Sequence, residues 1–161
     1  MAPPWGWSAH FDVHNCKNVH TQVVFNHERV HDSMYSDSIE ARHAKGVLKQ
    51  FLDMLIKRIE MKAYGSPMIH YFGSDRAKGW SVMQLIETSS ISIHTTDDTH
   101  DLYIDVFSCK HFDEDDIIDF IHEFWSPDKI KYECIERDAN KEDLQKSYSE
   151  QASGCRNICQ D

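Results

Sequence analysis

The chain has 161 residues, of which 40% are hydrophobic and 27% are charged, and its formal net charge is −10. This length suits one domain with its own core. The negative charge and the lack of a basic run argue against a nucleic-acid partner, which needs clustered Lys and Arg. No apolar stretch approaches the roughly 20 residues that span a bilayer, and residues 1–12 lack the pattern of a secretory signal. The five cysteines have unpatterned spacings, so we expect free thiols in a cytoplasmic protein.

The first half of the chain predicts one strand and one long helix. We expect a strand from Trp7 to Cys16, followed by a loop or hairpin insertion over residues 17–38. A helix is expected from about Ser38 to Met61, with Tyr64-Gly65-Ser66-Pro67 ending it, because Gly can turn left-handed and Pro cannot continue a helix. The apolar residues of this helix recur at helical spacing: they are Leu48, Phe51, Leu52, Leu55, Ile56 and Ile59.

Four strand candidates follow, rich in β-branched and aromatic residues and separated by polar turns. They cover about 68–73, 80–88, 90–96 and 102–109. The last candidate is largely apolar on both faces, whereas a sheet with one face in water should alternate more cleanly. We therefore expect a partner sheet from another subunit to cover the second face.

The C-terminal part predicts a second helix and a last strand. Asp113 is the expected N-cap, the acidic residues after it suit the helix dipole, and Ser126-Pro127 stops the helix. A strand over roughly 129–136 closes the sheet. We summarise the order as β-α-β-β-β-α-β, an α/β (α+β) two-layer sandwich with a mainly antiparallel sheet and both helices on one face. The domain is expected to cover residues 1–138, and the polar residues 139–161 are expected to form a flexible tail.

The segment from Ser81 to Cys109 carries a spaced set of residues with chemical potential. Ser89 follows Ser81 by eight residues, His94 follows Ser89 by five, and Cys109 follows His94 by fifteen. Together they offer a serine that can be rearranged into an electrophile, a histidine that can move protons and a thiol. The spacing therefore predicts an enzyme site, although any one of these residues alone would be unremarkable.

This set resembles the pyruvoyl-dependent S-adenosylmethionine decarboxylases in their short bacterial and archaeal form. Ser89 stands at the processing serine of the family, and His94 stands in the matching Ile93-His94-Thr95. Cys109 ends Asp105-Val106-Phe107-Ser108-Cys109, and Ser81, just after Gly79-Trp80, matches an upstream serine. The similarity extends more loosely over residues 6–137.

The resemblance implies a self-processing proenzyme that is cleaved between Thr88 and Ser89 and whose cofactor is a pyruvoyl group generated from Ser89. Such a ketone is an electron sink for decarboxylation. The resemblance also implies that His94 removes a proton during processing, that Ser81 holds the processing intermediate, and that Cys109 returns a proton to the substrate carbon. The implied substrate is S-adenosylmethionine, whose decarboxylated product is the aminopropyl donor of spermidine biosynthesis. The implied assembly is a homodimer of processed two-chain units with four layers, α/β/β/α.

The chain departs from the family at the cleavage site and after the histidine. Thr88 replaces the glutamate before the serine, and Glu87 lies one position earlier. Thr96-Asp97-Asp98 replaces Trp-Pro-Glu, so Asp98 is the positional substitute for a ribose-binding glutamate, and Phe72 is a candidate to stack on adenine. Two alternatives stay open: the same chemistry on ornithine or arginine, and a non-catalytic, unprocessed homologue that acts as a binding or regulatory subunit.

Ser90 competes with Ser89 as the nucleophile, and the five-residue offset to His94 favours Ser89. Histidine pairs also raise the question of a metal site. They are His10 with His14, which would share a strand face, and His27 with His31. No third ligand stands in a recognisable pattern, so we predict no metal and interpret these histidines as solvated polar positions.

Overall fold

The computed structural model describes residues 4–25 and 38–139. Its six strands form one antiparallel sheet in the order β2-β3-β4-β5-β1-β6. The strands are β1 (Gly6–His14), β2 (Ala63–Phe72), β3 (Gly79–Ile86), β4 (Ser89–Thr96), β5 (Asp101–Ser108) and β6 (Lys129–Arg137). The helices are α1 (Val19–Phe25), α2 (Ile39–Arg58), the short 3-10 helix η2 (Asp75–Ala77) and α3 (Glu114–Trp125).

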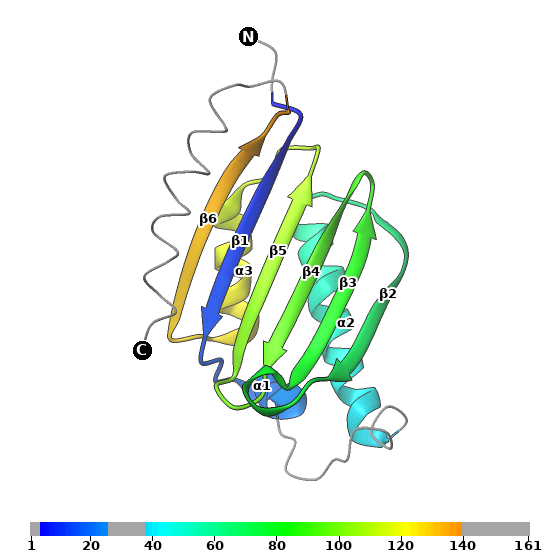
Figure 1. Cartoon of the computed structure of the whole chain (residues 1–161), viewed down its shortest axis with the longest axis vertical. Coiled ribbons are helices and arrows are strands. Elements are labelled where there is room, and N and C mark those ends of the chain that lie inside the picture. Colours follow the sequence, from blue (N-terminus) through cyan, green and yellow to red (C-terminus); the bar gives the residue numbers. More distant parts are fainter. Residues whose placement is uncertain (1–3, 26–37, 140–161) are drawn as a thin grey trace.

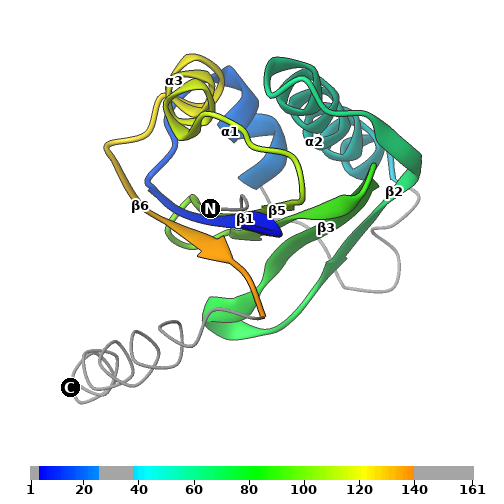
Figure 2. The same ribbon diagram turned by 90° about the horizontal axis from the view of Figure 1, so that it is seen from above.

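The fold has two layers, with α1, α2 and α3 on one side of the sheet (Figures 1 and 2). No helix of the described ranges lies on the opposite side, which we call the open face. The expected α+β sandwich with its helices on one face is therefore confirmed. The dimeric four-layer arrangement is not tested by a single chain.

Both long helices begin where the sequence predicts. The Ser38 hydroxyl accepts a hydrogen bond from the Ala41 N–H at 3.0 Å, and the Asp113 carboxylate accepts one from the Asp115 N–H at 3.0 Å. Each bond satisfies an N–H that has no partner within the helix. Helix α3 ends at Trp125, and its C-cap Ser126 has a left-handed backbone (φ 47°).

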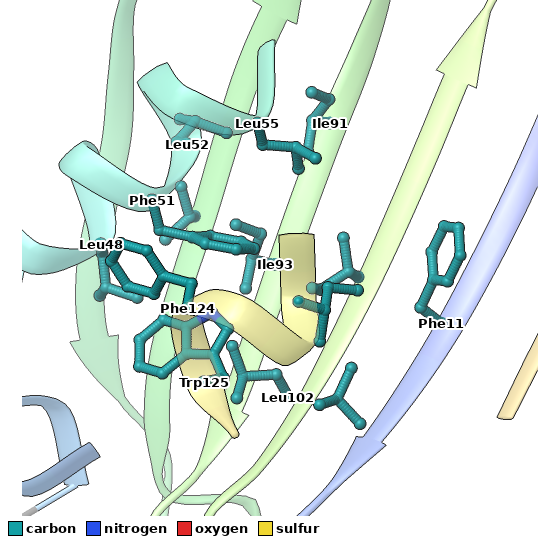
Figure 3. Packing of buried hydrophobic residues seen from close by; sticks show 14 of the residues in the cluster. Phe11, Leu48, Phe51, Leu52, Leu55, Ile91, Ile93, Leu102, Phe124 and Trp125 are labelled. Carbon is teal, nitrogen blue, oxygen red and sulfur yellow. The ribbon is translucent and has the colours of Figure 1, made fainter. Parts of the chain in front are cut away.

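The core lies between the helices and the sheet. Phe51 of α2 packs against Phe124 and Trp125 of α3, with ring centroids 5.1 and 5.4 Å apart. Figure 3 shows these rings beside Ile93 and Leu102 of the sheet. All six residues of the predicted apolar stripe of α2 are buried. Burial of such side chains is the main favourable term in folding.

Three expectations about the elements are wrong. Residues 19–25 form α1 rather than a loop or hairpin, because Val24 and Phe25 bury themselves in the core. Helix α2 ends at Arg58, and residues 64–67 lie inside β2, where a register shift between Tyr64 and Met68 accommodates them. The order β-α-β-β-β-α-β omits α1 and one of the four strands between α2 and α3. Residues 26–37 of the expected insertion and residues 140–161 of the expected tail, with His27 and His31, lie outside the described residues.

Gly79 is the first residue of β3, and it packs closely against the end of β4. A Cβ atom there would lie 1.9 Å from the Thr95 carbonyl oxygen. We expect Gly79→Ala to lower the free energy of unfolding by about 1–3 kcal/mol or more, because overpacking usually costs this much. The control is Gly46→Ala in α2, where a Cβ has nothing within 4 Å and should stabilise the helix slightly. Urea denaturation measures both, and equal midpoints would contradict the expectation.

Candidate active site

Ser89 lies at the tip of a tight hairpin. Strands β3 and β4 are joined by Glu87 and Thr88, because Ile86 pairs directly with Ser89. The Ser89 hydroxyl donates a hydrogen bond to the carbonyl oxygen of Thr88 and accepts one from the Cys109 N–H at 3.0 Å. The Cys109 thiol contacts the Thr88 hydroxyl. Ser89, Thr88 and Cys109 therefore form one group, the hairpin cluster, at the ends of neighbouring strands.

Ser81 and His94 form a second group. They are register partners on β3 and β4, and the Ser81 Oγ lies 2.9 Å from His94 Nδ1. His94 is exposed on the open face, and Ser81 is half-buried there. This Ser81–His94 pair thus presents a hydroxyl and an imidazole to whatever covers the open face.

The two groups lie far apart within one chain. His94 follows Ser89 by five residues along β4, which corresponds to about 16 Å at the rise of a strand. An odd offset also places the two side chains on opposite faces of the sheet. The hairpin cluster lies at the end of the sheet where β4 begins, and the Ser81–His94 pair lies toward the end where β4 stops (Figure 1).

The remaining candidates divide between these two ends. Glu87 is exposed beside the hairpin cluster, and its carboxylate accepts a hydrogen bond from Lys62 Nζ at 2.8 Å. Phe72 is the last residue of β2, paired with Gly79 and 56% exposed. Asp98 is exposed in the turn after β4. Phe72 and Asp98 therefore lie at the same end of the sheet as the Ser81–His94 pair.

Sequence reasoning missed one contact at this end. The Tyr71 hydroxyl donates a hydrogen bond to Asp97 Oδ2 at 2.5 Å, although the two residues are 26 positions apart. Burial raises the pKa of the Asp97 carboxyl to about 6, against the opposing effects of the Tyr71 hydrogen bond and the Lys78 ammonium. The altered Thr96-Asp97-Asp98 segment points to Asp97, but no local pattern points to Tyr71.

The open face also carries two histidine–carboxylate pairs on β1 and β5. His10 Nδ1 lies 2.6 Å from Asp105 Oδ1, and His14 Nδ1 lies 2.8 Å from Asp101 Oδ1. Within residues 4–25 and 38–139, no group of three or more His, Cys, Asp or Glu is arranged to hold a metal ion. A hollow of about 320 Å³ includes the second of these pairs and is lined by Asp12, Val13, His14, Asp101, Tyr103, Lys129 and Lys131.

None of the helices in the described part of the chain is both long and apolar enough to cross a membrane.

Comparison with solved structures first defines the type of fold. Residues of this chain superpose on the adenosylmethionine decarboxylase of Aquifex aeolicus with a TM-score of 0.59 at 18% sequence identity, covering 88% of this chain and 97% of the other. No curated protein sequence matches the chain.

The family follows from the sequence itself. The family model described as S-adenosylmethionine decarboxylase matches residues 33–138, and the chain belongs to this family. It is therefore an enzyme, a carboxy-lyase that decarboxylates S-adenosylmethionine. The family that the motif residues resemble is therefore confirmed.

Proposed function

We propose that the chain is a self-processing proenzyme that cleaves its Thr88–Ser89 bond, converts Ser89 into a pyruvoyl group and then decarboxylates S-adenosylmethionine to the aminopropyl donor for spermidine synthesis. The observation that carries the proposal is the contact of the Ser89 hydroxyl with the Thr88 carbonyl. The nucleophile and the carbonyl of the bond to be broken are adjacent, and the Cys109 N–H holds the hydroxyl there. The catalytic domain would cover residues 1–138.

The proposed cleavage balances without an outside oxidant or reductant. The Ser89 Oγ attacks the Thr88 carbonyl carbon, and the acyl group moves from nitrogen to oxygen to form an ester. A base then removes the Cα proton of residue 89, the Cβ–O bond breaks, and Thr88 leaves as a free carboxylate. Addition of water to the resulting dehydroalanine releases ammonia and leaves a ketone. Neutral imidazole suits the proton removal, so His94 is the proposed base.

The pyruvoyl ketone supplies the electron sink that decarboxylation requires and that ordinary side chains lack. The chain's own residues would bind and orient the substrate and move protons around this group. Cys109, whose thiol contacts Thr88 at the bond to be cleaved, is the proposed donor of the proton that replaces the lost carboxylate. Ser81, hydrogen-bonded to His94, would orient the imidazole and stabilise the processing intermediate. Glu87 would contact the substrate beside the cleavage site.

A single chain does not bring His94 to Ser89, so the proposal requires a second copy. The open face exposes large apolar side chains on β2, β3 and β5, which are Met68, Met83, Leu85 and Tyr103. Exposed apolar surface of this kind marks an interaction site. Two copies that stack these faces in opposite directions would bring the Ser81–His94 pair of each to the end of the sheet where the other carries its hairpin cluster, and the imidazole would approach the backbone of residue 89 from the open face. A two-fold axis would then create two equal sites.

The cellular setting follows from the thiols. Cys16, Cys109 and Cys134 are free, and a catalytic Cys109 must stay reduced. We therefore propose a cytoplasmic enzyme, since the cytosol keeps thiols reduced.

The substrate is tested by measuring carbon dioxide release from carboxyl-labelled S-adenosylmethionine, ornithine and arginine in parallel. We expect release from S-adenosylmethionine alone, because Phe72 and Asp98 are available for a nucleoside that the other two compounds lack. The control is the Ser89→Ala chain, which should release nothing from any of them. Release from ornithine or arginine alone would assign the chemistry to a basic amino acid instead.

A further inference from the structure

We infer that Tyr71 and Asp97 are positioning residues of the nucleoside-binding part of the site: their hydrogen bond joins the two backbone segments that carry Phe72 and Asp98, and it thereby sets the affinity for adenosyl ligands. The inference rests on the proposed function, because it assigns Phe72 to adenine and Asp98 to ribose. It goes beyond that function by naming two residues, neither of which is expected to touch the ligand.

The Tyr71–Asp97 hydrogen bond connects the two segments that carry the candidate ligand contacts. Tyr71 directly precedes Phe72 at the end of β2, and Asp97 directly precedes Asp98 in the turn after β4. The Tyr71 hydroxyl and Asp97 Oδ2 are 2.5 Å apart. Loops and turns are otherwise the least restrained parts of a fold, so this bond limits how far the two candidate contacts can move relative to each other.

Both ends of this hydrogen bond are anchored to the rest of the fold. The Tyr71 ring lies 5.2 Å from the ring of Trp80, which is buried and donates its indole N–H to the Val24 carbonyl. The Asp97 N–H donates to the Lys78 carbonyl at 3.0 Å. The core therefore fixes the position of Tyr71, and Tyr71 in turn restrains the position of Asp97 in the turn after β4.

The strength of the hydrogen bond depends on the charge of the Asp97 carboxyl. The groups that act on the Asp97 carboxyl come from each neighbouring element: Tyr71 from β2, Lys78 before β3, whose ammonium also lies 5.7 Å from the Tyr71 ring centroid, and Asp98 from the same turn. Burial raises the pKa of Asp97 to about 6. Above that pH the carboxylate is charged and accepts the Tyr71 hydrogen bond strongly, and below it the protonated group accepts it weakly. Affinity for the nucleoside should therefore fall as pH decreases through about 6.

The test measures binding of methylthioadenosine, which has the adenine and ribose of the substrate but no amino-acid group. Calorimetry on the full-length Ser89→Ala chain, from about pH 5 to about pH 7.5, makes the result independent of processing and turnover. Tyr71→Phe should weaken binding about tenfold at the upper pH, the scale of one hydrogen bond to a charged group. It should also remove the midpoint near pH 6, because no hydroxyl is left to donate to the Asp97 carboxylate at any pH. Asp97→Asn should bind weakly with no midpoint near pH 6.

Matched controls are Tyr132→Phe on β6 and Asp53→Asn on α2, both exposed, which should keep the affinity and midpoint of the parent. In the processed enzyme, Tyr71→Phe should raise the KM for S-adenosylmethionine about tenfold with kcat nearly unchanged. Parental affinity and midpoint in both Tyr71→Phe and Asp97→Asn would overturn the inference, as would failure of the parent chain to bind the nucleoside. A chain that binds the nucleoside with these pH effects but never cleaves itself would sustain the inference while overturning the proposed function.

Discussion

The Ser89→Ala chain is expected to remain one full-length species, whereas the parent protein should separate into fragments that end at Thr88 and begin at residue 89. Carbon dioxide release from S-adenosylmethionine should fall at least about a thousandfold, as it does when an enzyme loses the group on which its covalent chemistry depends. The reason is that the Ser89 hydroxyl is the group in contact with the Thr88 carbonyl. Intact-mass analysis of freshly purified protein reads the cleavage directly.

The matched control is Ser90→Ala, one residue further along β4. Ser90 pairs with Leu85 and Phe107 within the sheet, and no hydrogen bond of its side chain to the Thr88 carbonyl is observed in the described residues. This variant should cleave at the same bond as the parent. An uncleaved Ser90→Ala chain beside a cleaved Ser89→Ala chain would move the nucleophile to Ser90. A parent protein that stays full-length and still releases carbon dioxide would end the proposal of self-processing.

Co-expression of the His94→Ala and Ser89→Ala chains is expected to restore processing and activity that neither chain has alone. A mixed dimer would contain one complete site, formed by the hairpin cluster of the His94→Ala chain and the Ser81–His94 pair of the Ser89→Ala chain. Random pairing would restore about a quarter of the parental sites. Only the His94→Ala chain should be cleaved, because only it retains Ser89. Intact mass and carbon dioxide release measure both effects.

The control pair is Ser81→Ala with His94→Ala. These residues belong to the same Ser81–His94 pair, so every site in a mixed dimer of these chains carries one of the two defects. No mixed dimer should contain an intact site, and activity should stay at the level of the single variants. Recovery to a quarter of the parental activity in this pair, or no recovery in the first pair despite mixed dimers, would contradict a site shared between copies.

Sequence alone predicted the elements whose periodicity extends over several turns or alternations. Helices α2 and α3 begin directly after Ser38 and Asp113, close to the expected positions, because caps and apolar stripes are local features. Five of the six strands were predicted to within about two residues of their observed ends. The 7-residue α1 was missed because it is too short to display a repeated stripe. The start of β2 was missed because Gly65 and Pro67 are typical of a turn.

The candidate site was likewise predictable only in part from the sequence. The spacing of Ser89, His94 and Cys109 and the family to which they belong can be read along the chain, since a motif is a property of consecutive residues. Strand register decided the rest. It pairs Ser81 with His94, brings the Cys109 N–H to the Ser89 hydroxyl and joins Tyr71 to Asp97. These contacts join residues of different strands and of the turns beside them, so they exist only once the sheet has formed. The extended backbone of β4 also keeps His94 away from Ser89 of the same chain.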